Sequence, residues 1–227
     1  MTQPIDYSRP VELTCALNAD KTVTRLIPVL LVQAFAIWLL VALALGLMFP
    51  HVAAVSLVGG IIVAAAVCVP RYFRKRDELR RTYGQLQRLI LHPGGLRKSD
   101  DSVVIDMPWA QITRFEYRNS ALPPMRNPTV AGNAMRPAAS AALRHAHTVM
   151  GWGIVGYGLV TPLPGASARK LKFLDELGRS NLRNGQPHQS PDCLIFPAEF
   201  EPNWPSGVVG AWLRHYRPDL VLPALER

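Results

Sequence analysis

A long stretch without charged residues constrains this chain more than any other feature. From Leu26 to Val69 the sequence contains no Asp, Glu, Lys or Arg, and Pro50-His51 divides the stretch into two apolar segments. As helices, these segments would be about 36 and 27 Å long, whereas the hydrocarbon core of a bilayer is about 30 Å thick. A helix buried in a soluble core fits two adjacent runs of this length poorly, and a cleaved signal peptide has a shorter apolar region. The sequence therefore predicts a transmembrane helical hairpin over residues 25–70.

Basic residues beside the apolar stretch predict the orientation of the hairpin. Arg9, Lys21 and Arg25 precede the stretch, and the connection at Pro50-His51 has no Lys or Arg. The segment after Pro70 is rich in cations: Arg71, Arg74, Lys75, Arg76, Arg80 and Arg81. Because Lys and Arg accumulate on the cytoplasmic side of membrane proteins, both termini are expected in the cytoplasm. The six cations are also expected to lie at the membrane surface and to attract anionic lipid.

Small side chains recur at every fourth position of the second apolar segment: Ser56, Gly60, Ala64 and Cys68. This spacing places them on one face of a helix, and small residues allow helices to approach closely in lipid. The expected partner is the first segment, where Ala42 and Gly46 repeat the spacing. The same face could instead join two copies of the chain in a homodimer.

The stretch GWGIVGYG contains the G-x-G-x-x-G pattern of dinucleotide-binding loops, with Gly151, Gly153 and Gly156. Such a loop needs a strand before it and a helix after it. Here an Ala-rich helix is expected before the glycines, and Pro162 and Pro164 follow them. The pattern therefore favours a strand in which glycines allow close backbone approach, and no nucleotide cofactor is expected.

Other candidate chemical motifs lack the partners that their chemistry requires. Ser167 and Lys170 match S-x-x-K but have no K-T-G partner, and the Asp100-Asp101 pair is expected in a solvated turn. His145 and His147 have no Cys or carboxylate at ligand spacing, so no metal site is expected. No catalytic residue is predicted. The net charge of +9 lies largely beside the bilayer without a nucleic-acid motif, which argues against nucleic-acid binding.

The segment LQRLILHPGGLRKSDDSVVIDMPWAQITRFEY predicts short strands with a turn at Gly95-Leu96 and a step at Pro108-Trp109-Ala110-Gln111-Ile112. An apolar strand (CLIFP) and a terminal helix (PSGVVGAWLRHYRP) follow later. These elements after two apolar spans resemble bacterial membrane proteins with a YcxB-like or pleckstrin-homology-like (PH-like) domain. The resemblance implies a partly open β-barrel closed by one helix, used as a binding module, and it transfers no catalytic residue.

The expected fold class is α+β, in five parts: a cytoplasmic lead (1–24) that could be helical, the hairpin (25–70), a basic linker (71–84), a PH-like domain (85–218) with a long insertion (119–191), and a tail (219–227). The expected function is that of a non-enzymatic protein of the bacterial inner membrane whose cytosolic module recognises a protein partner or anionic lipid, in an accessory, regulatory or toxin-immunity role. The alternative is a membrane-bound enzyme with its site in the 119–191 insertion.

Overall fold

The computed structural model describes residues 5–48, 53–119, 150–166, 171 and 186–224. These residues belong to two compact units. The helical unit comprises residues 18–80, and the sheet unit comprises residues up to Leu17 together with the described residues from Arg81 onward. The fold class is α+β, as predicted.

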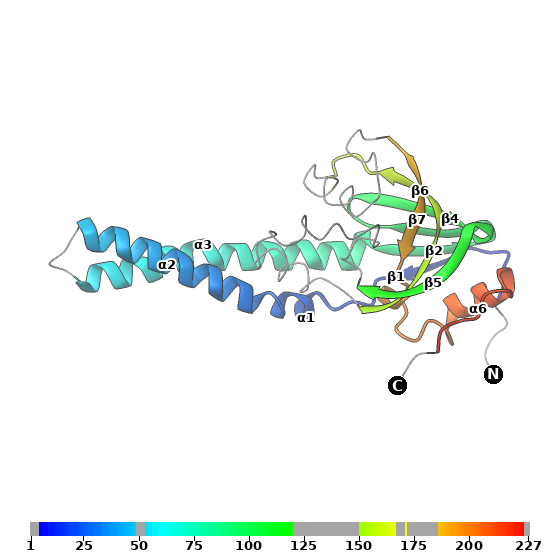
Figure 1. Cartoon of the computed structure of the whole chain (residues 1–227), viewed down its shortest axis with the longest axis horizontal. Coiled ribbons are helices and arrows are strands. Elements are labelled where there is room, and N and C mark those ends of the chain that lie inside the picture. The colour runs from blue at the N-terminus through cyan, green and yellow to red at the C-terminus, as the bar shows by residue number, and fades with distance from the viewer. Residues whose placement is uncertain (1–4, 49–52, 120–149, 167–170, 172–185, 225–227) are drawn as a thin grey trace, which may run out of the picture. The chain divides into compact units, whose positions relative to one another are not determined.

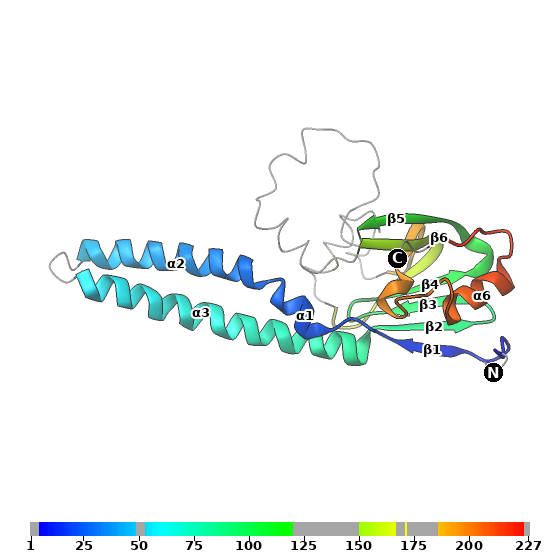
Figure 2. The same cartoon turned by 90° about the horizontal axis from the view of Figure 1, so that it is seen from below.

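The helical unit contains α1 (Ala19–Thr24), α2 (Ile27–Met48) and α3, which runs from Ala53 to Arg81. Figure 2 shows α2 and α3 side by side. Both helices are long and apolar enough to cross a membrane, as the sequence predicted. No residue of α2 is buried, and large side chains such as Leu40 and Leu47 are exposed.

The basic segment after Pro70, which was predicted as a linker over residues 71–84, is helical. α3 continues through Pro70 to Arg81, and a π-helical turn, η1 (Thr82–Leu86), follows it. A proline removes one helical hydrogen bond and bends a helix, but it does not have to end one. The residues after Pro70 include Arg, Lys, Glu and Leu, whose high helix propensity allows the helix to resume.

The sheet unit contains seven antiparallel strands: β1 (Val11–Thr14), β2 (Arg88–His92), β3 (Gly95–Ser99), β4 (Val103–Pro108), β5 (Ile112–Asn119), β6 (Met150–Pro162) and β7 (His188–Ile195). β4 pairs with the end of β6 from Leu159 to Pro162, and β5 pairs with its start from Met150 to Gly156. β7 takes the opposite edge of β6. β4 and β5 therefore act as one long strand that bends at η2 (Trp109–Gln111).

The N-terminal segment forms an edge strand of this sheet, so the expectation of a helical lead was wrong for residues 11–14. Val11 pairs with Leu91, and Thr14 pairs with Arg88. Figure 1 draws β1 in blue within the sheet unit. The side chains of Val11 and Leu13 pack against the core, as the alternation of a strand requires. The helices are therefore inserted in the chain between two neighbouring strands of one sheet.

The long segment 119–191 is not only an insertion, because it contributes a central strand. β6 lies within it and pairs with three other strands, and β7 begins within it. The Ala-rich helix expected before the glycines, with His145 and His147, lies outside the described residues, and so do Ser167 and Lys170.

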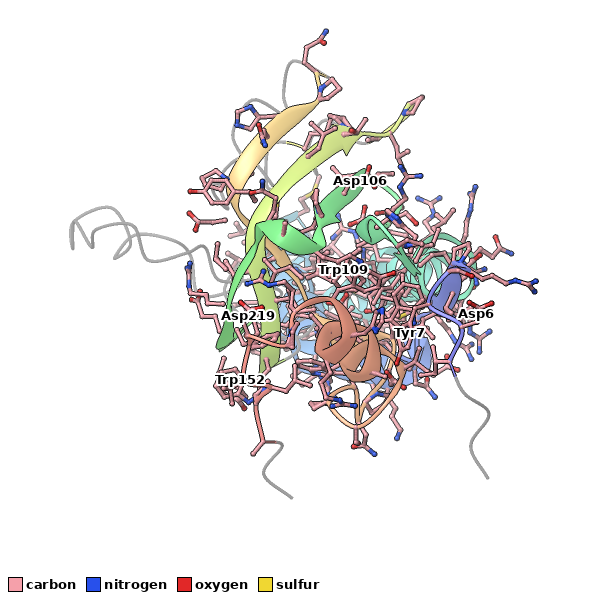
Figure 3. The ribbon with its side chains drawn as sticks, turned by 90° about the vertical axis from the view of Figure 1, so that its right-hand side faces the viewer. Asp6, Tyr7, Asp106, Trp109, Trp152 and Asp219 are labelled. Carbon is pink, nitrogen blue, oxygen red and sulfur yellow. The ribbon has the colours of Figure 1, made fainter. Side chains whose placement is uncertain are left out.

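The main core lies between the open sheet and the C-terminal helix α6 (Val208–Tyr216), which matches the terminal helix expected from the sequence. Trp212 of α6 is fully buried, and Trp109 and Tyr216 stack with their ring centroids 5.2 Å apart. The rings of Tyr7 and Trp212 pack edge to face, with their centroids 5.4 Å apart. Figure 3 labels Tyr7 and Trp109 beside this helix. The Glu201 carboxylate accepts hydrogen bonds from the first two backbone N–H groups of α6, which satisfies that end of the helix.

Candidate membrane-surface site

The small-residue face of α3 lies against α2. From Ser56 to Pro70, the buried residues of α3 are Ser56, Gly60, Ala64 and Cys68. A Cβ atom on Gly46 of α2 would lie 3.7 Å from Ser56 Oγ. At the other end of this face, Cys68 Sγ lies 4.0 Å from the Leu30 carbonyl oxygen, so the face contacts the other helix of the same hairpin.

The two helices approach each other closely at Gly60. A Cβ atom there would lie 2.9 Å from Trp38 Cδ1 and 3.0 Å from the Trp38 carbonyl oxygen. The absent side chain leaves room for the indole, whose Nε1 donates a hydrogen bond to the Leu57 carbonyl oxygen at 3.2 Å. A polar indole in the middle of an apolar helix thus obtains its partner from the neighbouring helix, which the mid-span position of Trp38 in the sequence did not reveal.

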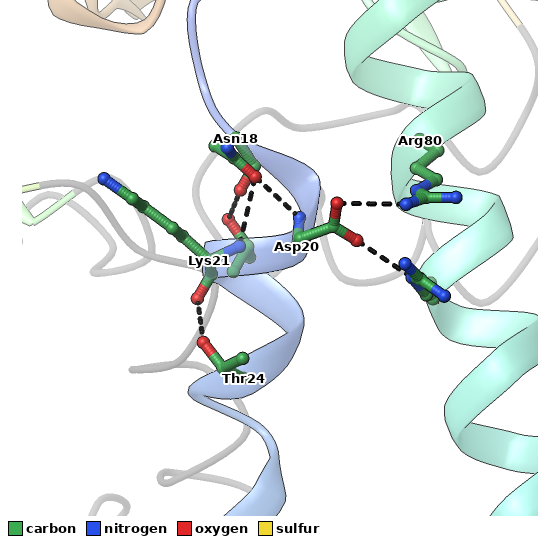
Figure 4. A network of polar contacts seen from close by, with 7 residues as sticks. Asn18, Asp20, Lys21, Thr24 and Arg80 are labelled. Carbon is green, nitrogen blue, oxygen red and sulfur yellow. Dashed lines mark hydrogen bonds and ion pairs between the residues drawn. The ribbon is translucent and has the colours of Figure 1, made fainter.

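Beyond the apolar stretch, an ion-pair cluster replaces small residues between the helices. Asp20 of α1 accepts from Arg76 Nε at 2.9 Å and from Arg80 at 3.0 Å (Figure 4). Asn18 caps α1 by accepting from the backbone N–H groups of Asp20 and Lys21, which fixes the first turn that carries the carboxylate. Hydrogen bonds from Arg80 and Arg76 lower the pKa of Asp20, so the carboxylate stays charged at neutral pH.

The basic residues of α3 therefore differ in their partners. Arg76 and Arg80 bind Asp20, and Lys75 binds Glu78 at 2.9 Å. Arg71 and Arg74 are exposed and form no ion pair with any residue that the structure describes; the same holds for Arg81. Sequence reasoning grouped all six cations as one lipid-facing set, because the Asp20 contact joins residues more than fifty positions apart.

The glycine pattern lies inside β6, as the sequence favoured. A Cβ atom on Gly156 would lie 2.4 Å from the Gln111 carbonyl oxygen, and one on Gly153 would lie 2.4 Å from Leu194 Cδ1. The glycines thus allow the neighbouring strand β5 and the side chains of β7 to approach β6. No helix follows them in the described residues up to Ala166, so the arrangement for holding a pyrophosphate is missing there.

A buried ion pair in the sheet unit escaped the sequence analysis. Lys98 Nζ of β3 lies 2.6 Å from Glu199 Oε2, and their side chains are only 12% and 9% exposed. The same oxygen accepts from Gln87 Nε2 at 2.8 Å, and the Glu199 carbonyl oxygen accepts from the Ala16 N–H at 2.8 Å. Glu199 thus contacts residues that precede and follow the inserted helices. One clue was available: Lys98 has the same strand parity as the buried Leu96.

The charges of Glu199 and Lys98 both affect the pKa of the Cys15 thiol. The pKa of the Cys15 thiol is raised to about 11, chiefly by burial. A backbone hydrogen bond from Leu17 and the Lys98 ammonium lower it, and the negative charge of Glu199 contributes to the rise. The thiol is therefore protonated at neutral pH and a weak nucleophile.

No group of three or more His, Cys, Asp or Glu side chains in the described residues could hold a metal ion. The Asp100 carboxylate closes the β3–β4 turn by accepting from the backbone N–H groups of Ser102 and Val103, which agrees with the turn expected for Asp100-Asp101.

The chain matches no protein-family model, no curated protein and no solved structure. The resemblance to YcxB-like and PH-like proteins therefore rests on its short motifs.

Proposed function

We propose that this chain is a non-enzymatic protein of the bacterial inner membrane that presents a PH-like binding module in the cytoplasm. In this proposal α2 and α3 cross the bilayer, and the sheet unit binds a protein partner or anionic lipid. The observation that carries the proposal is the exposed apolar surface of α2, which has no buried residue. A helix in the core of a soluble protein would bury such a surface, and an exposed apolar face of this extent marks an interaction surface.

The strand pairing of the sheet unit supports a topology with both flanks of the hairpin on one side. β1 precedes the helices and β2 follows them, and the two strands are joined by backbone hydrogen bonds. Paired strands lie in the same compartment, so an even number of crossings must separate them. The cations before α2 and after Pro70 favour the cytoplasm as that compartment.

The binding role is assigned to the sheet unit because loops on a rigid scaffold commonly carry recognition. Its core of buried aromatic and aliphatic side chains provides such a scaffold. The connections between β5 and β6 and between β6 and β7 are the longest in this unit, and they are the proposed determinants of specificity.

Two measurements on the full chain test the proposal. Membranes containing the protein are washed with alkaline carbonate, and a reporter fused after Arg227 or between Pro50 and His51 reports its compartment. We expect retention in the membrane, with the C-terminal reporter cytoplasmic and the internal one on the opposite side. Release into the carbonate wash would refute the membrane assignment.

Crosslinking in native membranes tests the binding role, with saturable capture of one partner as the expected result. A tightly bound metal or substrate turnover by the purified chain would instead favour the enzyme.

A further inference from the structure

The two arginine pairs of α3 point in nearly opposite directions. Arg71 and Arg74 are three residues apart and share one helical face. Arg76 and Arg80 are four residues apart and bind Asp20 on α1. At about 100° per residue, the mean directions of the two pairs differ by about 170°. One pair is used to hold the helices together, and the other faces away from that contact.

Arg71 and Arg74 also lie next to the end of the uncharged stretch. With a rise of about 1.5 Å per residue, their Cα atoms follow that of Val69 by about 3 and 7.5 Å along the helix. The Debye length at physiological ionic strength is about 8 Å, so both would feel charges at a membrane surface located there. Arg80 is about 16 Å beyond Val69, outside that range.

We infer that Arg71 and Arg74 form a binding site for the phosphate groups of anionic phospholipids. This inference rests on the proposed function, because it requires α3 to cross the bilayer. The guanidinium group matches a phosphate with two parallel hydrogen bonds, and neither arginine forms an ion pair with a carboxylate of the described residues. Between them, Tyr72 and Phe73 pack edge to face at 5.5 Å, and Phe73 is 50% exposed. Aromatic side chains at this position favour the headgroup region.

The inference differs from a general attraction of six cations to the membrane. If only the charge count mattered, removing any two arginines would weaken anionic-lipid binding equally. If partners and position matter, Arg71 and Arg74 carry most of the preference, and Arg76 and Arg80 mainly stabilise the hairpin.

The test compares two double variants of the full chain that lose the same charge, Arg71→Gln/Arg74→Gln and Arg76→Gln/Arg80→Gln. Each is placed in nanodiscs of phosphatidylcholine with increasing phosphatidylglycerol, and bound phosphatidylglycerol is measured by native mass spectrometry after release in mild detergent. At about 1 kcal/mol per arginine near the surface, the first double variant should bind phosphatidylglycerol about 30-fold more weakly. The second should change binding by less than about 3-fold, because its arginines lie farther along the helix and face Asp20.

Equal losses in the two variants, or no loss in the first, would overturn this inference. A preliminary carbonate wash of membranes separates the two levels of the argument. Wild-type protein that is released by carbonate refutes the membrane assignment, and the lipid site with it. Protein that stays in the membrane but binds phosphatidylglycerol equally well in both variants refutes the lipid site alone.

Discussion

Replacing Lys98 by Met should destabilise the sheet unit strongly, although the change is conservative in size. Methionine fills a volume similar to that of the lysine stem, so packing is largely kept. The loss is electrostatic, because the Glu199 carboxylate would remain 9% exposed with Gln87 as its remaining side-chain partner. Breaking a buried ion pair by removing one partner costs about 3–5 kcal/mol.

This cost can be converted into a melting temperature. For chains of this size, 1 kcal/mol corresponds to a shift of about 2–4 °C, so Lys98→Met should lower the apparent midpoint by about 6–20 °C. The double variant Lys98→Met/Glu199→Gln removes both charges and leaves a neutral amide beside Gln87. Because replacing a whole buried pair is often nearly neutral, the double variant should recover most of the loss.

The assay is thermal unfolding of the full chain in detergent micelles, followed by tryptophan fluorescence. Trp204 and Trp212 are fully buried in the sheet unit and report on its core. Arg97→Met is the matched control on the same strand: its partner Asp106 is 2.5 Å away, but the Arg97 side chain is 53% exposed. An exposed pair contributes about 0–1 kcal/mol, so the control should shift the midpoint by less than about 4 °C.

Two results would contradict the argument. If the melting temperature of Lys98→Met is within about 2 °C of the wild-type value, the Lys98–Glu199 ion pair stabilises the sheet unit no more than an exposed pair would, despite its burial. If the double variant loses as much stability as Lys98→Met and Glu199→Gln lose when their separate losses are added, the two residues act independently and Glu199 is not held by Lys98.

Four further changes test the packing and the charges. Gly60→Leu should destabilise the hairpin by about 1–3 kcal/mol in SDS titration, because the side chain would displace the Trp38 indole, whereas Gly84→Leu, in open space, should not. Ser56→Ala should leave the hairpin as stable as wild type or stabilise it by up to about 1 kcal/mol in the same titration, because Ser56 Oγ is buried and has no hydrogen-bond partner among the described residues. Cys15, identified by peptide mapping, should react with iodoacetamide at pH 8 about 100-fold more slowly than a thiol with the ordinary pKa of 9.0. Its reaction should become faster as the pH rises toward 11. The reaction should also be faster in Glu199→Gln, because this variant removes a charge that raises the pKa of the thiol. Because the pKa of Asp20 is lowered, its ion pairs stabilise the hairpin fully when the pH is above the ordinary carboxyl pKa. This stabilisation is lost as the pH falls through the lowered pKa. Acid should therefore reduce the melting temperature of wild type more than that of Asp20→Asn.

Local pattern was sufficient to predict several elements of the fold. The absence of charge from Leu26 to Val69 predicted two long apolar helices, and the glycines near Gly153 were correctly assigned to a strand. Short strands were also predicted in the segment that ends in ITRFEY, where the structure has β5 (Ile112–Asn119). In each case the property that determines the element lies within a few consecutive residues.

The errors arose where a distant contact overrides local preference. Val11–Thr14 has no strong preference of its own, and it becomes a strand because β2 offers an unpaired edge. Pro70 suggested a boundary, but the helix-forming residues after it continue α3 to Arg81. The ion pair of Lys98 has no local signal, because its partner Glu199 lies about a hundred positions later in the chain.

Glu199 lies where the inserted helices leave the sheet after β1 and return to it before β2, and its contacts there have a physical reason. Inserting a hairpin into a sheet separates two adjacent strands by more than seventy residues, and closing so long a loop costs more conformational entropy than a tight turn. β1 has only four residues, so its ladder with β2 contributes few hydrogen bonds against this cost. Glu199 adds one bond to Ala16, directly after β1, and one to Gln87, directly before β2. A single residue therefore holds both ends of the insertion, and loss of its charge partner should loosen β1 before it loosens the strands that pair through β6.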